Sequence, residues 1–235
     1  MQNYQQFLER IFSFETKELN IRTPFVTNNS VNLKVDPQNR FRNFYGDTTV
    51  FNLEDPIKDE LARYTEILYQ AIPNCWAEPL RSETFHVTLH DLSNSAHLEE
   101  IASQTYHNEI NLLKLLSQTE LAPQEIEMRT TFVFNMVNTS LCLGLCPSNE
   151  EEYKKWMVLY NLLEKIRPLP YPSTPHITLA YYSPQGFDEL TCQNLRECVR
   201  QLNERTFSII LKTNNLYYQK FLSMNEYINI FKLIP

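Results

Sequence analysis

The chain has 235 residues, of which 43% are hydrophobic, and its formal charge is −7 at neutral pH. The apolar fraction is that of a packed globular protein, and the length suits one large domain or two small lobes. Three glycines and the lack of any GxGxxG or GxxxxGK(S/T) pattern argue against dinucleotide-binding and P-loop folds. The negative charge argues against a general polyanion binder, because such binding depends on neutralising phosphates.

The cysteines and the N-terminal residues bear on the cellular compartment in which we expect the protein. Five cysteines form an odd number without a CxxC pair, so we expect reduced, mostly buried thiols and no zinc site. The first residues lack a basic region followed by an apolar stretch, and no apolar run approaches the roughly 18 residues that span a bilayer. We expect a soluble cytoplasmic protein that does not bind a membrane.

The first half of the chain predicts alternating helices and strands. Apolar spacing predicts a helix over residues 4–15 and another over 98–116. Asp55 and Pro56 start a third helix, which Pro73 ends. Alternation and β-branched residues predict strands at 31–35, 48–53 and 85–92.

The second half repeats this pattern after Pro123. Strands are predicted at residues 126–137 and 141–145, followed by a helix that a capping box at Ser148 and Glu151 opens and Pro168 stops. Four prolines between 168 and 175 form a stiff approach to a further strand. A helix at 189–203 and strands at 207–211, 216–221 and 227–233 complete the chain. These elements predict an α+β protein with two mainly antiparallel sheets and outer helices that line a shared central cleft.

One short pattern occurs in each half. His86-Val87-Thr88-Leu89 and His176-Ile177-Thr178-Leu179 lie 90 positions apart, and only five histidines occur in the chain. In a strand, successive side chains point to opposite faces. Each copy should therefore direct its histidine and threonine to one face and its aliphatic pair to the other.

Two such strands would bring two imidazoles and two hydroxyls together. A histidine pair supplies a general base and a general acid near neutral pH, and threonine hydroxyls donate to phosphoryl oxygens. Hydrolysis of a cyclic phosphodiester needs these groups and, in principle, no metal or other cofactor. We therefore assign His86 and His176 as the acid–base pair and Thr88 and Thr178 as phosphate-contacting groups.

The two motifs resemble the 2H phosphoesterase superfamily, which includes LigT-like enzymes and cyclic nucleotide phosphodiesterases. Residues 34–35 and 41–50 (Phe-Arg-Asn-Phe-Tyr-Gly-Asp-Thr-Thr-Val), and residues 176–182, resemble a poorly characterised bacterial branch. The resemblance implies a pseudo-two-fold, bilobal fold over residues 1–235, with 1–30 as a helical extension, and we expect a monomer. It also implies a metal-independent phosphoesterase that acts on a small nucleotide or on the 2′,3′-cyclic phosphate end of RNA.

Two other functions stay open at this stage. A noncatalytic nucleotide- or RNA-end-binding module would keep the same residues without turnover. An RNA 2′–5′ ligase or end-processing enzyme would need a continuous basic groove, which the acidic composition does not favour.

Aromatic residues near the motifs are candidates for stacking on a base. Tyr171 lies on the proline-rich approach, and Tyr45 precedes the strand at 48–53. Strict alternation from His176 places Tyr181 in the core and Tyr182 on the face of the histidine. Tyr45, Tyr171 and Tyr182 are therefore candidate substrate-binding residues.

Polar candidates complete the predicted site. Asn52 lies on the face opposite its apolar neighbours and is placed to bond substrate, and Arg129 would add a cation near the phosphate. His90 shares the parity of His86 and is a candidate at the rim of the cleft. A zinc site at His86 and His90 is rejected, because residues four apart in a strand are about 13 Å apart.

Overall fold

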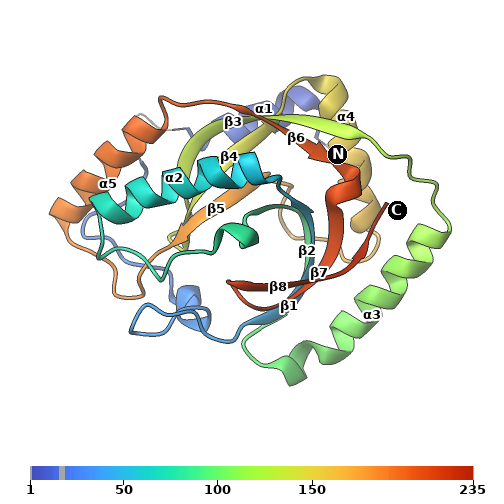
Figure 1. Cartoon of the computed structure of the whole chain (residues 1–235), viewed down its shortest axis with the longest axis horizontal. Coiled ribbons are helices and arrows are strands. Elements are labelled where there is room, and N and C mark those ends of the chain that lie inside the picture. Colours follow the sequence, from blue (N-terminus) through green and yellow to red (C-terminus); the bar gives the residue numbers. More distant parts are fainter. Residues whose placement is uncertain (1, 16–18, 235) are drawn as a thin grey trace.

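The computed structural model describes residues 2–15 and 19–234, and it shows an α+β protein built on two four-stranded sheets (Figure 1). The strand orders are β2–β1–β7–β8 and β5–β4–β3–β6, and every neighbouring pair is antiparallel. The predicted fold class is thereby confirmed. The strands are β1 (Tyr45–Asn52), β2 (His86–Ser95), β3 (Glu125–Met136), β4 (Ser140–Pro147), β5 (His176–Tyr181), β6 (Ser208–Lys212), β7 (Leu216–Ser223) and β8 (Glu226–Lys232).

Helices pack around the two sheets. α3 lies beside the first sheet, and α2 and α5 lie side by side (Figure 1). Within the described residues, no helix combines the length and apolar character needed to cross a membrane. The α-helices are α1 (Tyr4–Phe12), α2 (Asp55–Ala71), α3 (Leu98–Ser117), α4 (Glu150–Leu163) and α5 (Glu189–Leu202), and short 3-10 helices are η1 (Asn29–Leu33), η2 (Ser82–Thr84) and η3 (Thr213–Asn215).

The strands of the first sheet are not all consecutive in the chain. β1 and β2 form half of the first sheet, and the C-terminal hairpin β7–β8 returns to complete it by pairing with β1. The two strands that carry the repeated motif, β2 and β5, are each an edge strand, and they contact one another. The sheets therefore meet along the two strands that carry the histidines.

A single hydrophobic cluster lies behind this junction. It includes Val87 and Leu89 from β2, Ile177 and Leu179 from β5, and Trp156 from α4, all at most 2% exposed. Burying these side chains stabilises both sheets at once, because each contributes roughly 1.5–3 kcal/mol when removed from water. Burial of the two aliphatic residues in each motif thus holds its histidine and threonine on the opposite face of the strand.

Three local predictions were wrong. Residues 31–35 do not form a strand: η1 occupies 29–33, and the Asn28 side chain accepts a hydrogen bond from the backbone N–H of Ser30 at its start. α4 is capped by Asn149 rather than Ser148, because the Asn149 side chain accepts from two backbone N–H groups while Ser148 bonds Glu127. α1 and α4 also end earlier than predicted, at Phe12 and Leu163.

Candidate functional site

The four motif residues lie on one side of the junction between the sheets. His86 and Thr88 on β2, and His176 and Thr178 on β5, are half-buried, whereas the aliphatic residues between them are buried. The charge of His176 affects the pKa of His86, so the two imidazoles are within electrostatic range of each other. We call this surface the histidine face.

Both imidazoles are held by the same kind of bond. Nδ1 of His86 lies 2.7 Å from the carbonyl oxygen of Thr84, and Nδ1 of His176 lies 2.7 Å from the carbonyl oxygen of Thr174. A carbonyl oxygen only accepts, so each Nδ1 must carry the proton and donate it. In a neutral imidazole, Nε2 is then the acceptor, and it is the atom left for chemistry at both positions.

Burial favours the neutral form of both imidazoles. Burial lowers the pKa of His86 to about 4, against the hydrogen bond to Thr84 and the Asp91 carboxylate, which raise it. Burial also lowers the pKa of His176, and the bond to Thr174 and Asp91 again oppose the shift. A histidine pair of this kind must gain one proton before it can supply both an acid and a base.

Aromatic rings and a thiol border the two motifs. The ring of Tyr227 lies 4.9 Å from that of His86, and the ring of Phe134 lies 6.3 Å from that of His176. The Cys142 thiol is 3.8 Å from the hydroxyl of Thr178. All five cysteines of the chain are buried and unpaired, and burial raises the pKa of Cys142 to about 11, so its thiol is not a nucleophile here.

A β-bulge follows the threonine in each motif. Val50 pairs with Thr88 and Thr49 with His90, so Leu89 is an extra residue in β2. In β5, the pairs of Thr178 and Ala180 with β4 likewise leave Leu179 extra. A bulge reverses the alternation of the side chains that follow it.

The bulge overturns the prediction for His90. Its side chain is 0% exposed, with Nε2 2.8 Å from the Glu164 carboxylate and Nδ1 2.6 Å from the Asp91 carbonyl. His90 therefore lies on the side of α4, away from the histidine face. The next residue, Asp91, is exposed, and its carboxylate acts on the pKa of both catalytic candidates.

The bulge at Leu179 reverses the positions predicted for Tyr181 and Tyr182. Tyr182, predicted to be on the face of His176, is fully buried, with its ring 4.7 Å from Phe25 and 5.5 Å from Trp76. Tyr181, predicted to be in the core, is half-buried, and its hydroxyl contacts the sulfur of Met224 at 3.1 Å. Tyr182 is thus a packing residue, while Tyr181 borders the histidine face.

Two further candidates lie away from the histidines. Tyr45 pairs with Ser95 at the end of β1 opposite to Asn52, a separation of about 20 Å along the strand. Arg129 on β3 is two strands from β5, and its guanidinium donates to the Ser148 carbonyl at 3.0 Å. Neither residue adjoins the histidines in this structure.

The two remaining candidates do border them. Asn52 pairs with His86 across β1 and β2, and its amide bonds Gln219 and Asn229. Tyr171 is exposed, and its hydroxyl donates to the Asp91 carboxylate at 3.2 Å. These contacts keep Asn52 and Tyr171 as candidates for substrate binding.

Sequence reasoning missed Lys34 at this site. Its ammonium lies 5.0 Å from the ring of Phe44 and 5.3 Å from that of Tyr181. Burial lowers the pKa of Lys34, and the Asp91 carboxylate opposes this. The resemblance to the bacterial branch includes Lys34, but residues 31–35 have the alternation of a strand and no charge pattern that would mark the lysine as a site residue.

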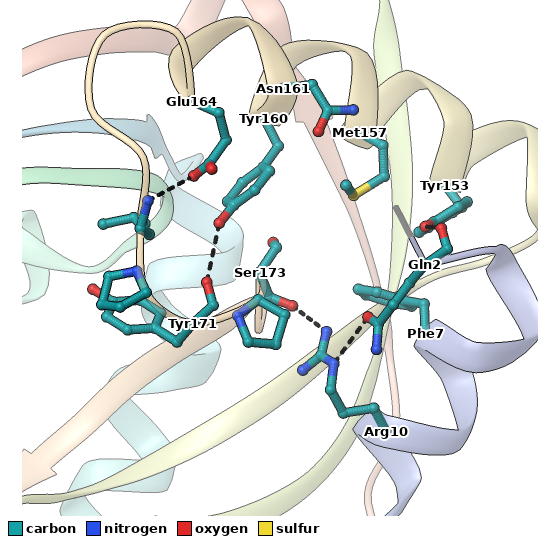
Figure 2. A pocket seen from close by; sticks show the side chains of 13 residues that line it. Gln2, Phe7, Arg10, Tyr153, Met157, Tyr160, Asn161, Glu164, Tyr171 and Ser173 are labelled. Atoms are coloured by element: carbon teal, nitrogen blue, oxygen red, sulfur yellow. Dashed lines mark hydrogen bonds between the residues drawn. The ribbon is translucent and has the colours of Figure 1, made fainter.

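A separate pocket of about 330 Å³ lies behind the segment that leads to His176 (Figure 2). α1, α4 and the proline-rich segment enclose it, and none of the four motif residues lines it. Arg10 of α1 donates from this pocket to the Ser173 carbonyl and, at 2.9 Å, to the Thr174 hydroxyl. Arg10 therefore holds the residue whose carbonyl orients His176.

No metal-binding cluster is evident in the part of the chain that the structure describes. Residues 2–15 and 19–234 contain no group of three or more histidine, cysteine, aspartate or glutamate side chains placed to hold an ion. The polar groups at the histidine face include the two imidazoles, the threonine hydroxyls, the Asp91 carboxylate and the Lys34 ammonium.

The arrangement defines an α+β protein with a histidine pair at the junction of two antiparallel sheets. Neither a protein-family model nor a curated protein matches the chain. Among solved structures, it is similar to a conserved protein of unknown function from Agrobacterium tumefaciens, with a TM-score of 0.68, 12% identity, and 96% of this chain and 99% of that chain covered. At this identity, the likeness concerns the fold.

Two further structures show weaker similarity. LigT of E. coli complexed with ATP gives a TM-score of 0.47 and 15% identity, over 80% of this chain and 96% of that chain. TT0787 of Thermus thermophilus gives a TM-score of 0.46 and 14% identity, over 79% of this chain and 94% of that chain.

Proposed function

We propose that this protein is a metal-independent phosphoesterase that hydrolyses a 2′,3′-cyclic phosphate or a related 2′-linked nucleotide. The observation that carries the proposal is the matched pair of imidazoles, each with Nδ1 bonded to the carbonyl two residues earlier. This bond leaves Nε2 of both His86 and His176 available for proton transfer. A structural role would not require the same tautomer at both positions.

The reaction uses the two imidazoles in opposite roles. One Nε2 takes a proton from water as the water oxygen bonds to phosphorus, and the protonated Nε2 of the other histidine gives its proton to the departing ribose oxygen. The P–O bond to that oxygen breaks, and the product is a phosphomonoester. Thr88 and Thr178 donate hydroxyl hydrogens to the nonbridging oxygens, where charge develops.

The experiment is a turnover assay with 2′,3′-cyclic mononucleotides of all four bases and a 2′–5′-linked dinucleotide. Activity in wild type that His86→Ala and His176→Ala abolish, with unchanged circular dichroism, would support the proposal. Tight binding of these nucleotides without turnover would instead indicate a noncatalytic binding module. Equal activity in wild type and both variants would show that the histidines are not the acid–base pair.

A further inference from the structure

We propose that the ammonium group of Lys34 binds the phosphate of the substrate beside the Thr178 hydroxyl. This inference rests on the phosphoesterase function proposed above and adds a phosphate-binding residue from outside the two motifs. It depends on where the backbone places Lys34, on the lack of a counter-ion, and on the neighbours that Lys34 shares with the histidine pair.

The backbone directs Lys34 toward the histidine face. Lys34 ends η1, where its N–H donates to the Val31 carbonyl at 2.8 Å and its carbonyl accepts from Arg42 at 2.8 Å. Its ammonium then lies between the rings of Phe44 and Tyr181, at 5.0 and 5.3 Å. Tyr181 follows Thr178 on β5 and reaches this face only because of the bulge at Leu179.

The ammonium lacks a counter-ion. Within residues 2–15 and 19–234, no carboxylate forms an ion pair with Lys34, and its Nζ makes no hydrogen bond. Two aromatic rings attract a cation through their faces but accept none of its three N–H groups in a normal hydrogen bond. Withdrawing a charged group from water is costly unless it is paired, so an anion that bonded the ammonium directly would be stabilised here.

Lys34 shares its neighbours with the catalytic candidates. The Asp91 carboxylate acts on the pKa of Lys34, His86 and His176. The Cys142 thiol acts on the pKa of Lys34 and lies 3.8 Å from the Thr178 hydroxyl. The ammonium therefore shares the neighbour Cys142 with the hydroxyl and the neighbour Asp91 with the imidazoles, and we infer that one phosphate contacts both the ammonium and the hydroxyl.

A cation beside the nonbridging oxygens would also help the reaction on chemical grounds. Burial lowers the pKa of both imidazoles, and no lysine or arginine is bonded to either ring within the described residues. A cyclic phosphodiester carries one negative charge, and more charge develops on its oxygens during attack by water. A positioned cation stabilises that charge most where water is partly excluded.

The test measures the binding of inorganic phosphate by isothermal titration calorimetry in wild type, Lys34→Met and Lys34→Arg. Lys34→Met removes the charge and keeps the length, and it should raise the phosphate Kd by about 10–100-fold, the loss typical of a charge-assisted bond. Lys34→Arg should retain most of the affinity. Lys114→Met, on the exposed surface of α3, changes the net charge equally and should leave the Kd unaltered.

The outcomes separate this inference from the proposed function. If wild type fails to hydrolyse any cyclic nucleotide but Lys34→Met weakens phosphate binding, the function is wrong and Lys34 still binds phosphate. If wild type hydrolyses the substrate and Lys34→Met keeps its kcat/KM and phosphate Kd, Lys34 has no such role. Failure of wild type to bind phosphate would also overturn it. Lys34→Gln, which stays polar, replaces Lys34→Met if that variant does not fold.

Discussion

The two halves of the molecule orient their histidines identically but support them differently. His86 bonds the carbonyl of Thr84, which belongs to η2, a turn closed by the backbone N–H of Thr84 donating to the Arg81 carbonyl. His176 bonds the carbonyl of Thr174, which lies in an extended segment without such a turn. There, the guanidinium of Arg10 supplies the support from 164 residues away.

The carbonyl that orients the imidazole is therefore held by local structure in one half of the molecule and by tertiary contacts in the other. A short turn fixes a carbonyl through bonds between near neighbours. Among the described residues, the extended segment before His176 has no backbone–backbone hydrogen bond between its own residues, so its backbone needs other support. The segment before His176 is therefore tied to α1 through Arg10 and to α4 through Trp156, whose indole N–H donates to Ser173.

The largest expected effect comes from removing the histidines themselves. His86→Ala and His176→Ala should each lower kcat/KM by about 10²–10⁴-fold, because each removes one general acid or base. The double variant should be little worse than either single variant, since the two groups act in the same step. Steady-state kinetics with a 2′,3′-cyclic mononucleotide measures this. Fully multiplicative losses would show that the two histidines act independently.

The supporting groups should have smaller and unequal effects. Arg10→Met should lower kcat by about 10–100-fold with little change in KM, because a misplaced imidazole slows proton transfer. Arg10→Lys should recover part of the loss, since an ammonium reaches one of the two acceptors.

A matched pair of substitutions tests the same asymmetry directly. Thr174→Val and Thr84→Val each delete a hydroxyl from the residue whose carbonyl holds a histidine. Only the Thr174 hydroxyl accepts from Arg10, so Thr174→Val should reduce kcat more than Thr84→Val. Equal kcat values for these two variants would argue that Arg10 does not position His176.

The pH dependence of kcat/KM should show the effect of the Asp91 carboxylate, which acts on both histidines. One imidazole must be protonated, and burial puts the pKa of both below the usual value of about 6.5, so kcat/KM should fall as pH rises through the lowered pKa values, in a range below pH 6.5. Asp91 raises the pKa of both histidines, so Asp91→Asn should move this fall to lower pH. Tyr171→Phe keeps the Asp91 charge and should leave the profile in place. An unmoved profile in Asp91→Asn would contradict this.

The smallest expected effect is on stability, at the contact that joins β2 to α4. Glu164 accepts from the buried ring of His90 at 2.8 Å and from the backbone N–H of Leu169 at 3.1 Å. Glu164→Gln should therefore reduce the free energy of unfolding by about 1–3 kcal/mol in urea denaturation. Glu60→Gln, which breaks an exposed pair with Arg63 on α2, should change it by less than about 0.5 kcal/mol. Equal losses would mean that the buried contact is not special.

The sequence predicted the strands that carry the histidines correctly, but it was less reliable in predicting which other residues surround them. The strand parity of His86, Thr88, His176 and Thr178 follows from apolar alternation, and the structure places these side chains accordingly. The predictions for His90 and Tyr182 were wrong, because Leu89 and Leu179 are bulged. A bulge depends on how the neighbouring strand pairs, and the sequence of the bulged strand shows no sign of it.

The order of residues along the chain was enough to predict the fold class, the two strands that carry the histidines, and the face on which the histidines and threonines lie. These follow from local propensity and periodicity, which neighbouring residues carry along the chain. Tertiary packing determined which strands share a sheet, that Asp91 and Tyr181 border the histidine face, and that Lys34 reaches it from the N-terminal region. It also determined that Arg10 bonds Thr174 from the separate pocket. Such contacts join residues far apart in sequence, and only packing of the whole chain brings them together.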